Sequence, residues 1–489
     1  MAVLVIDVGS SSVRAMLFDD HARPVPGAAA SRPHQFITQP PGAACADAMT
    51  LRRLTEACLD EILEHPLAAQ IEGVGLASFT GSLLGVNAEG APITPVYTYA
   101  DTRSEADVQT LASRIDGETF HQRTGCLHHV SYFPGRFHWL RRTEPARYQA
   151  VARWLDFCTY LYQQWFGAAP CSYSMASWTG MLDRVALAWD RAWLTILEIS
   201  PSALPELADY DRMQAGLVPV YARRWPALRD VPFCLAVGDG AAANVGSGST
   251  GPTTIALTVG TTAALRVIVP GEPPSVPAGL WSYRLDKGHH ILGGATSEGG
   301  NIFRWARATL ALPDAADIEA ELGRRAPDAH GLTFLPLLSG ERSPGWAGSA
   351  TGSIAGLRLS TQPLDILQAA LEGVALRLAL TAHQLSAVVP DDAPLMAAGG
   401  ALVASPAWTQ MIASALNRPL ARLAEAEITA RGAAILALRA LGRCSLSDHP
   451  PAIAQVIHPI PDQRAALRRA LERQVELYQK LVADPAMRG

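Results

Sequence analysis

The first eighteen residues constrain the fold of this chain more than any other stretch. Residues 2–6 form a continuous apolar run, residues 7–12 are mostly small and polar, and residues 13–18 return to an apolar, β-prone pattern. This order predicts two antiparallel strands joined by a tight turn, with the first strand buried on both faces. Such strands belong to sheets that are covered on both sides, which favours an α/β protein.

The polar turn between these strands has the composition of an anion site. Gly9 lets the backbone approach a ligand, and the backbone N–H groups and hydroxyls of Ser10, Ser11 and Ser12 are donors suited to a phosphate. Asp7 ends a buried strand, where its carboxylate can reach a divalent cation carried by that phosphate. An ordinary hairpin turn uses the same residue types, so on this stretch alone both interpretations stay open.

Length and charge narrow the class of protein. A chain of 489 residues is too long for one core and predicts two large domains. The formal net charge is −5 and no Lys/Arg-rich block occurs, so we expect no nucleic-acid partner. No apolar run approaches the ~20 residues of a membrane span, and no signal segment is recognisable at the N-terminus. Seven scattered cysteines without a Cys-x-x-Cys pair predict free thiols and a cytoplasmic protein.

The second half of the chain repeats the pattern of the first. Residues 253–259 and 263–269 predict two more strands, joined by the small polar turn of residues 260–262. A strand–turn–strand unit at the head of each half predicts duplicated domains that face one cleft. We place the boundary in a glycine-rich segment, which gives domains of residues 1–247 and 248–489.

That glycine-rich segment also matches the Gly-x-Gly-x-x-Gly pattern of dinucleotide-binding proteins, at residues 246–251. The dinucleotide pattern must follow a strand and open a helix, whereas this segment follows a helix start and precedes a strand. We therefore interpret it as an interdomain hinge, which argues against a dehydrogenase.

Asp239 is the most informative single carboxylate. It follows an apolar stretch predicted to be a strand, residues 231–237, and has a glycine on each side. An aspartate in that place is able to act as a general base toward a hydroxyl, although a helix N-cap explains the residue equally well. Gly399-Gly400 also has two interpretations, contact with a flat ligand or a plain turn. Arg14 and Asp101 suit either a functional site or an ion pair.

Taken together, several short motifs resemble the FGGY family of carbohydrate kinases, which have the actin-like, hexokinase-like (ribonuclease H-like) ATPase fold. The resemblance covers nearly the whole chain, and the order and spacing of the motifs are more specific than any one of them. The motifs are Asp7-x-Gly9-Ser10-Ser11-x-x-Arg14, Gly238-Asp239-Gly240, Gly260-Thr261-Thr262, the stretch from Gly399 to Pro419, and Glu427-x-Thr429-Ala430-x-Gly432.

The resemblance implies an ATP-dependent kinase with Mg²⁺ as the cation. It implies that Asp239 is the catalytic base and that Asp7 lies at the metal. The residues implied at the nucleotide are Gly9, Ser10, Ser11, Arg14, Gly260, Thr261, Thr262, Gly300, Arg304, Gly400 and Ala404. Those implied at the sugar are Thr80, Gly81, Asp101, His129 and Asp239.

Within the family, the stretches 99–103, 124–126, 172–180 and 334–344 look most like gluconate kinases, with xylulose kinases close behind. The expected reaction is phosphorylation of the terminal hydroxyl of a small open-chain sugar or sugar acid. The substrate loop departs from both subfamilies, because Thr80-Gly81 replaces their usual Met-His. A non-catalytic sugar- or nucleotide-binding regulator is the rival class, and the presence of Asp239 favours the enzyme. A homodimer is left open.

Overall fold

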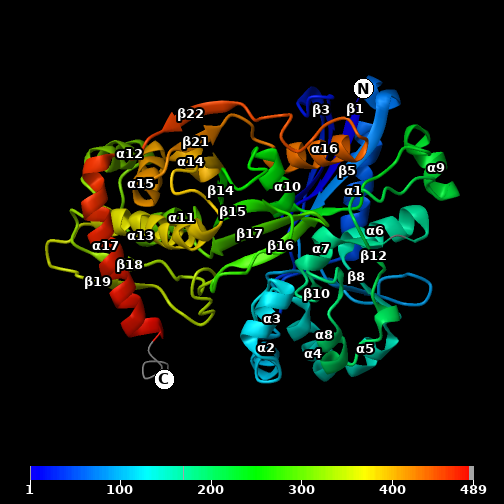
Figure 1. Ribbon diagram of the computed structural model, residues 1–489, viewed down its shortest axis with the longest axis horizontal. Helices are drawn as coiled ribbons and strands as arrows, with labels where there is room; N and C mark the ends of the chain where they lie inside the picture. The colour runs from blue at the N-terminus through cyan, green and yellow to red at the C-terminus, as the bar shows by residue number, and fades with distance from the viewer. Residues whose placement is uncertain (1, 169, 484–489) are drawn as a thin grey trace.

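The structure is a computed structural model that describes residues 2–168 and 170–483. Two domains lie side by side, each built on a mixed sheet, which confirms the predicted α/β class (Figure 1). The sheet of the first domain has the order β13 (Val237–Gly238), β5 (Ile71–Ser78), β1 (Ala2–Val8), β2 (Ser12–Phe18), β3 (Pro24–Pro33). The sheet of the second domain has the order β16 (Trp281–Asp286), β17 (His289–Thr296), β15 (Ala263–Pro270), β14 (Ile255–Val259), β20 (Leu395–Ala398), β21 (Leu420–Leu423), β22 (Ile453–Ile457).

Both predicted strand–turn–strand units are present. β1 pairs with β2 in antiparallel register, with Val8 opposite Val13, and β14 pairs with β15 in the same way, with Val259 opposite Ala263. Every residue of β1 is buried, because β5 flanks it in parallel and helices cover both faces of the sheet. The two turns therefore lie at corresponding places in the two domains.

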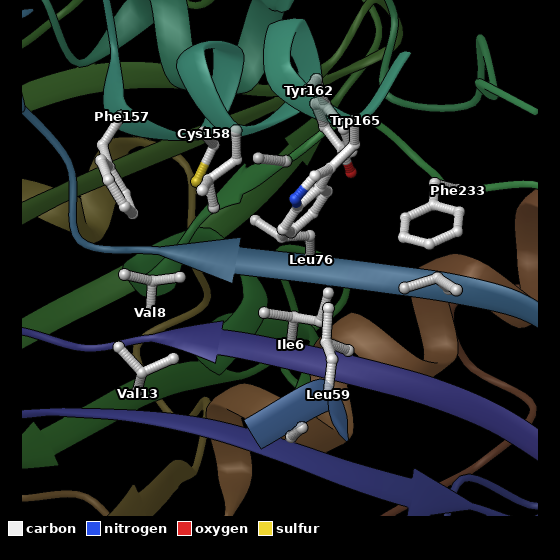
Figure 2. Close-up of a cluster of buried hydrophobic side chains, with 14 of the residues drawn as sticks. Ile6, Val8, Val13, Leu59, Leu76, Phe157, Cys158, Tyr162, Trp165 and Phe233 are labelled. Carbon is white, nitrogen blue, oxygen red and sulfur yellow. The ribbon is translucent and has the colours of Figure 1, made fainter. Parts of the chain in front are cut away.

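One face of the first sheet packs against helices α1 (Ala48–Ile62) and α6 (Phe157–Phe166). Figure 2 shows Ile6 and Leu76 of neighbouring strands beneath Tyr162 and Trp165, which come from α6. Burial of each such side chain contributes about 1.5–3 kcal/mol, so this core fixes the strand end that carries Asp7.

Helix α1 begins after Asp47, whose carboxylate accepts the Thr50 N–H at 2.7 Å and caps the helix. One predicted element boundary is wrong. The strand expected over residues 231–237 is reduced to β13 and two isolated bridges at Phe233. Between them the chain leaves the sheet, because the Leu235 N–H donates to the Tyr210 carbonyl oxygen at 2.9 Å and not to β5.

The remaining helices of the first domain surround its sheet and carry its outer lobe. They are α2 (Glu105–Ala112), α3 (Gly117–Thr124), α4 (Phe133–Thr143), α5 (Pro145–Ala150), α7 (Tyr173–Ser177), α8 (Arg191–Leu197), α9 (Pro219–Arg224) and α10 (Asp239–Gly246). Those of the second domain are α11 (Asn301–Thr309), α12 (Ala315–Arg324), α13 (Pro363–Gln384), α14 (Gly400–Ala404), α15 (Pro406–Leu416), α16 (Ile428–Ala440) and α17 (Arg464–Tyr478). Among the described residues, no helix combines the length and the apolar character that crossing a bilayer requires.

Helices α10 and α16 cross where the two domains meet. Although α16 lies between β21 and β22 of the second sheet in sequence, it packs against β1 and β5 of the first, beside the blue strands in Figure 1. A Cβ at Gly246 would lie 1.9 Å from the Ile428 carbonyl oxygen, and one at Gly432 would lie 1.8 Å from the Ala242 carbonyl oxygen. The two backbones are in contact at this crossing, so no larger residue fits. Gly246 is therefore part of a helix and not of a loose linker.

Candidate active site

Asp239 opens α10 directly after β13. The N-cap of this helix is Gly238, so Asp239 is free of the capping role that the sequence left open. A Cβ at Gly238 would lie 2.8 Å from atoms of both Thr80 and Trp178, and one at Gly240 would lie 3.1 Å from Trp178. The flanking glycines thus let the Trp178 ring pack against the backbone on either side of the carboxylate.

A cavity of about 190 Å³ opens in front of this carboxylate. Residues from both domains line it, so it lies in the cleft between them. The first domain contributes Thr80, Gly81, Tyr99, Ser131, Tyr132, Trp178, Asp239 and Gly240, and the second contributes Thr262, Ala264, Arg266, Trp281, Tyr283, Ala295, Arg342 and Trp346.

The surroundings of Asp239 make it a stronger base than an aspartate in water. Burial raises its pKa above the ordinary value of 3.8, while the Gly240 N–H, at 2.7 Å, and the charge of Arg266 oppose that rise. A carboxylate with a raised pKa beside a cavity is suited to accept a proton from a hydroxyl.

Asp7 lies near Asp239, close enough for the two charges to interact. It is 7% exposed, and burial raises its pKa to about 7. Arg14 opposes this rise in the pKa, and the negative charges of Asp239 and Glu427 add to it. Two carboxylates beside a turn of this kind suit a cation carried by a phosphate.

The first turn keeps its donors accessible. Ser10 and Ser11 are exposed, and the Gly9 N–H closes the turn on the Ser12 carbonyl oxygen at 2.9 Å. Arg14 forms an ion pair with Glu427, a residue of the other domain, and so links the two domains beside this turn. Its place at the nucleotide stays a prediction.

The predicted nucleotide residues of the second domain are brought together. The Gly300 N–H donates to the Gly260 carbonyl oxygen at 2.6 Å, and the Asn301 N–H donates to that of Thr261 at 3.2 Å. Gly399 precedes α14, the helix bounded by Gly400 and Ala404, at φ +123°, where a Cβ would lie 2.2 Å from the Val259 carbonyl oxygen. The loops therefore gather at the ends of β14 and β20, where α/β proteins bind ligands. Arg304 lies on α11, one turn after Gly300.

The predicted sugar residues divide into two groups. Thr80 and Gly81 line the cavity, whereas Asp101 does not and is instead 2.6 Å from Arg103 in a buried ion pair. The substrate contact expected of Asp101 stays a prediction. His129 lines a neighbouring cleft, and burial lowers its pKa to about 3, so its imidazole is neutral.

Comparisons with known proteins agree with this geometry. The model of the FGGY family of carbohydrate kinases, N-terminal domain, matches residues 2–246, and that of the C-terminal domain matches residues 255–441. The chain belongs to this family. Because the family is defined by its reaction, this protein is an ATP-dependent carbohydrate kinase, a phosphotransferase with an alcohol acceptor.

Individual relatives leave the sugar unresolved. A gluconokinase from Bacillus subtilis (strain 168) is 27% identical, over 91% of this chain and 89% of the relative. Ligand-bound xylulose kinase and gluconate kinase, both from Lactobacillus acidophilus, are each 26% identical over 99% of both chains, with TM-scores of 0.91 and 0.90.

Sequence reasoning missed most of the wall of this cavity. Trp178 stacks on Tyr283 with ring centroids 3.7 Å apart, and Trp281 also stacks on Tyr283 at 4.5 Å. Arg266 carried a usable signal, because a charged residue inside the apolar strand β15 needs an explanation. Gly81 has little room for a larger residue, since a Cβ there would lie 3.0 Å from the Ser131 carbonyl oxygen and 3.2 Å from the Tyr99 Cβ.

The kinase's own carboxylates suit a magnesium ion carried by the nucleotide. Among residues 2–168 and 170–483, no cluster of three or more His, Cys, Asp or Glu residues forms a metal cage. Mg²⁺ commonly keeps several waters and binds through one or two carboxylates plus substrate phosphates. Asp7, buried and close to Asp239, fits that pattern and would hold the ion against the phosphates.

Asp7→Asn is expected to stabilise the unliganded kinase at neutral pH. Well below pH 3.8 the carboxyl is protonated in both the folded and unfolded chain, so it has no effect on stability. As the pH rises toward the folded-state pKa of about 7, the unfolded chain loses its proton first and the folded state is penalised. At roughly 1.4 kcal/mol per pKa unit, the rise in the pKa costs the folded state roughly 4 kcal/mol, which the neutral asparagine removes.

Urea unfolding at pH 5 and pH 8 measures this effect. The advantage of the asparagine variant over the natural protein should be clearly larger at pH 8. An equal difference at both pH values would show that the Asp7 carboxyl titrates normally.

Proposed function

We propose that this kinase transfers the γ-phosphoryl group of ATP to the terminal hydroxyl of an open-chain sugar acid of the gluconate type. The observation that carries the proposal is the charge of the sugar cavity. Asp239 faces two arginines there, Arg266 and Arg342, so the cavity has an excess of positive charge that a neutral sugar would leave uncompensated.

Arg342 is the candidate partner of the substrate's carboxylate. Its side chain forms no ion pair with any described residue, and its Nε is buried without a hydrogen-bond partner. Its charge lowers the pKa values of both His129 and Arg266, and the side chain lines the cavity. A planar guanidinium binds a carboxylate in a bidentate way, which suits it to this role.

Arg266 is the cavity arginine whose charge acts on Asp239. It donates to Thr258 Oγ1 at 2.7 Å, and its charge opposes the rise in the pKa of Asp239. Burial lowers the pKa of Arg266 to about 10, so it stays charged at neutral pH. We assign it to keeping Asp239 ionised and to balancing charge near the transferred phosphoryl group.

The proposed reaction uses these residues in one step. Asp239 accepts the proton of the terminal hydroxyl as its oxygen forms a bond to the γ-phosphorus, and the bond from that phosphorus to the β,γ-bridging oxygen breaks. The turns of residues 9–12 and 260–262 orient the phosphates. Asp7 would hold a Mg²⁺ ion beside them, and that ion would supply positive charge against their negative charge. The aromatic wall excludes water from the acceptor site, which suppresses ATP hydrolysis.

The setting proposed is the cytoplasm, with the sugar acid and ATP as the partners. All seven cysteines are free thiols, as a reducing compartment would keep them. A pentulose such as xylulose is the second candidate acceptor, favoured by the TM-score of 0.91 to a ligand-bound xylulose kinase.

The variant Arg342→Gln tests whether Arg342 binds the carboxylate of the substrate. Loss of a charge-assisted hydrogen-bond pair costs about 1.5–3 kcal/mol, so the KM for gluconate should rise roughly 10–100-fold. The KM for MgATP and activity toward xylulose or sorbitol should change little, and Arg342→Lys should fall between. Arg358→Gln, an exposed arginine outside the cavity, is the matched control.

Two results would reject a sugar acid as the substrate of this enzyme. One is a natural enzyme that prefers xylulose to gluconate, glucarate and xylonate. The other is a variant that loses turnover equally with every acceptor, because Arg342 would then act on the phosphoryl group.

A further inference from the structure

A second hollow lies beside the sugar cavity. This cleft, of about 900 Å³, runs between helix α2 of the first domain and the loop of residues 345–353 of the second. Its polar side chains include Glu105, Gln109, Ser349 and Thr351. The size lies within the roughly 300–1,000 Å³ of pockets that hold organic ligands, and the lining suits a ligand rich in hydroxyls. Nothing in the proposed reaction uses this space.

Trp346 is the wall between the two spaces. It lines both the cleft and the sugar cavity, and it meets His129 of the other domain edge-on, with ring centroids 5.2 Å apart. Its indole N–H donates to the Gly279 carbonyl oxygen at 2.8 Å. The ring is therefore fixed from both domains where the cavity would otherwise open into the cleft.

The backbone holds this ring in an uncommon conformation. Trp346 has φ +56°, in the left-handed region that bulky residues rarely adopt. Buried Glu341 holds the loop in this shape, since its carboxylate accepts the N–H groups of Gly345 at 3.2 Å and Ala347 at 3.3 Å. Such strain persists only where the surroundings determine it, and it concentrates at functional sites.

The two spaces differ in size. The cavity beside Asp239 has a volume of about 190 Å³, whereas the cleft on the other side of Trp346 has about 900 Å³. Because Trp346 lines both, an acceptor that fills the cavity meets the indole ring where it would otherwise extend into the cleft.

We propose that Trp346 sets the upper size limit of the acceptor, and that the cleft behind it is a subsite for hydroxyl-rich extensions of the sugar. The inference rests on the proposed function for the identity of the acceptor but not for the position of the wall. In the natural enzyme the ring excludes acceptors longer than about six carbons and those carrying a glycosyl group. Without the ring, these extensions occupy the cleft.

The test compares kcat/KM for gluconate, glucoheptonate and 4-O-glucosyl-gluconate. The natural enzyme should favour gluconate at least 10-fold over either larger acid. Trp346→Ala should shift this ratio about 10-fold or more toward the larger acids, whereas Trp346→Phe should keep it. Trp189→Ala is the matched control, because that half-buried indole also donates to a carbonyl, of Pro205 at 2.8 Å, away from the cavity. Because the test compares kcat/KM values for different acids on the same variant, a general loss of activity cancels in their ratio.

The experiment distinguishes a failure of this inference from a failure of the proposed function. An unchanged ratio in Trp346→Ala, with a normal melting temperature and normal ATP binding, would overturn the inference. So would a natural enzyme that already accepts 4-O-glucosyl-gluconate as readily as gluconate, a result that needs no variant. If Trp346→Ala does not fold, Trp346→Leu takes its place. If the natural enzyme rejects every sugar acid, the proposed function fails, and xylulose against sedoheptulose measures the same size limit.

Discussion

Asp239→Asn should lower the turnover number by about three decades or more while MgATP and the sugar still bind. Asparagine has nearly the same shape, so the packing of Trp178 on the flanking glycines and the volume of the cavity are retained. What the amide lacks is the ability to accept a proton at neutral pH. General-base catalysis contributes about 10²–10⁴-fold, and the two neighbouring arginines would in addition lose the negative charge that they balance.

Three measurements test this prediction. Sugar-dependent ADP release gives the turnover number, calorimetric titration gives the affinity for MgATP, and a pH profile of the natural enzyme gives the pKa of the base. Turnover should fall on the acid side with an apparent pKa above the 3.8 of a free aspartate, because burial raises the pKa of Asp239. Near-normal turnover in the variant would remove Asp239 from the mechanism.

Asp209→Asn is the control for the loss of a carboxylate as such. Asp209 is also half-buried with a raised pKa, but it accepts the backbone N–H of Lys287 and lies outside the cavity. Its replacement should leave turnover within a few-fold of the natural value. An equal loss in both variants would mean that any missing buried charge disables the fold.

The parts of the fold that local pattern encodes were predictable. The run of residues 2–6 and its counterpart at 253–259 gave the two central strands, since continuous burial needs an unbroken apolar run. Asp239 was found because glycines on both sides of a carboxylate after an apolar stretch are rare without a reason. The reason, contact with Trp178, lies sixty-one residues earlier in the chain and was not visible in the pattern.

Contacts in the folded chain explain what the sequence left open. Asp101 and Arg14 suited either a site or an ion pair, and each has an ion-pair partner: Arg103, close by in the chain, and Glu427, from the other domain. Arg342 and Trp346 stand in an irregular loop, where no periodicity marks which side chain faces a cavity. Their importance depends on the closure of the two domains, and a single sequence records that closure only through family motifs.

Gly432→Ala is expected to destabilise the protein by about 4 kcal/mol or more, at the exceptional end for one methyl group. The new Cβ would lie 1.8 Å from the Ala242 carbonyl oxygen, and helical backbone on both sides cannot yield as a flexible side chain would. Domains are stable by about 5–15 kcal/mol, so the variant would be partly unfolded at 37 °C. Gly323→Ala is the control, because its Cβ meets nothing within 4 Å and should stabilise α12 by about 0.5–1 kcal/mol.

The same crossing connects the fold to the reaction. Any shift that relieves the clash moves α10, and Asp239 is the first residue of α10, so the folded fraction of Gly432→Ala should also turn over more slowly. Urea melts give the stability, and turnover per folded molecule, titrated by ATP binding, gives the second effect. Gly246→Ala introduces a clash at the same crossing from the other helix. The double variant should therefore lose less stability than the sum of the losses in the two single variants. A melting curve like that of the natural protein would show that the helices can separate at little cost, and the contact between the two backbones could then not be what holds Asp239 at the cleft.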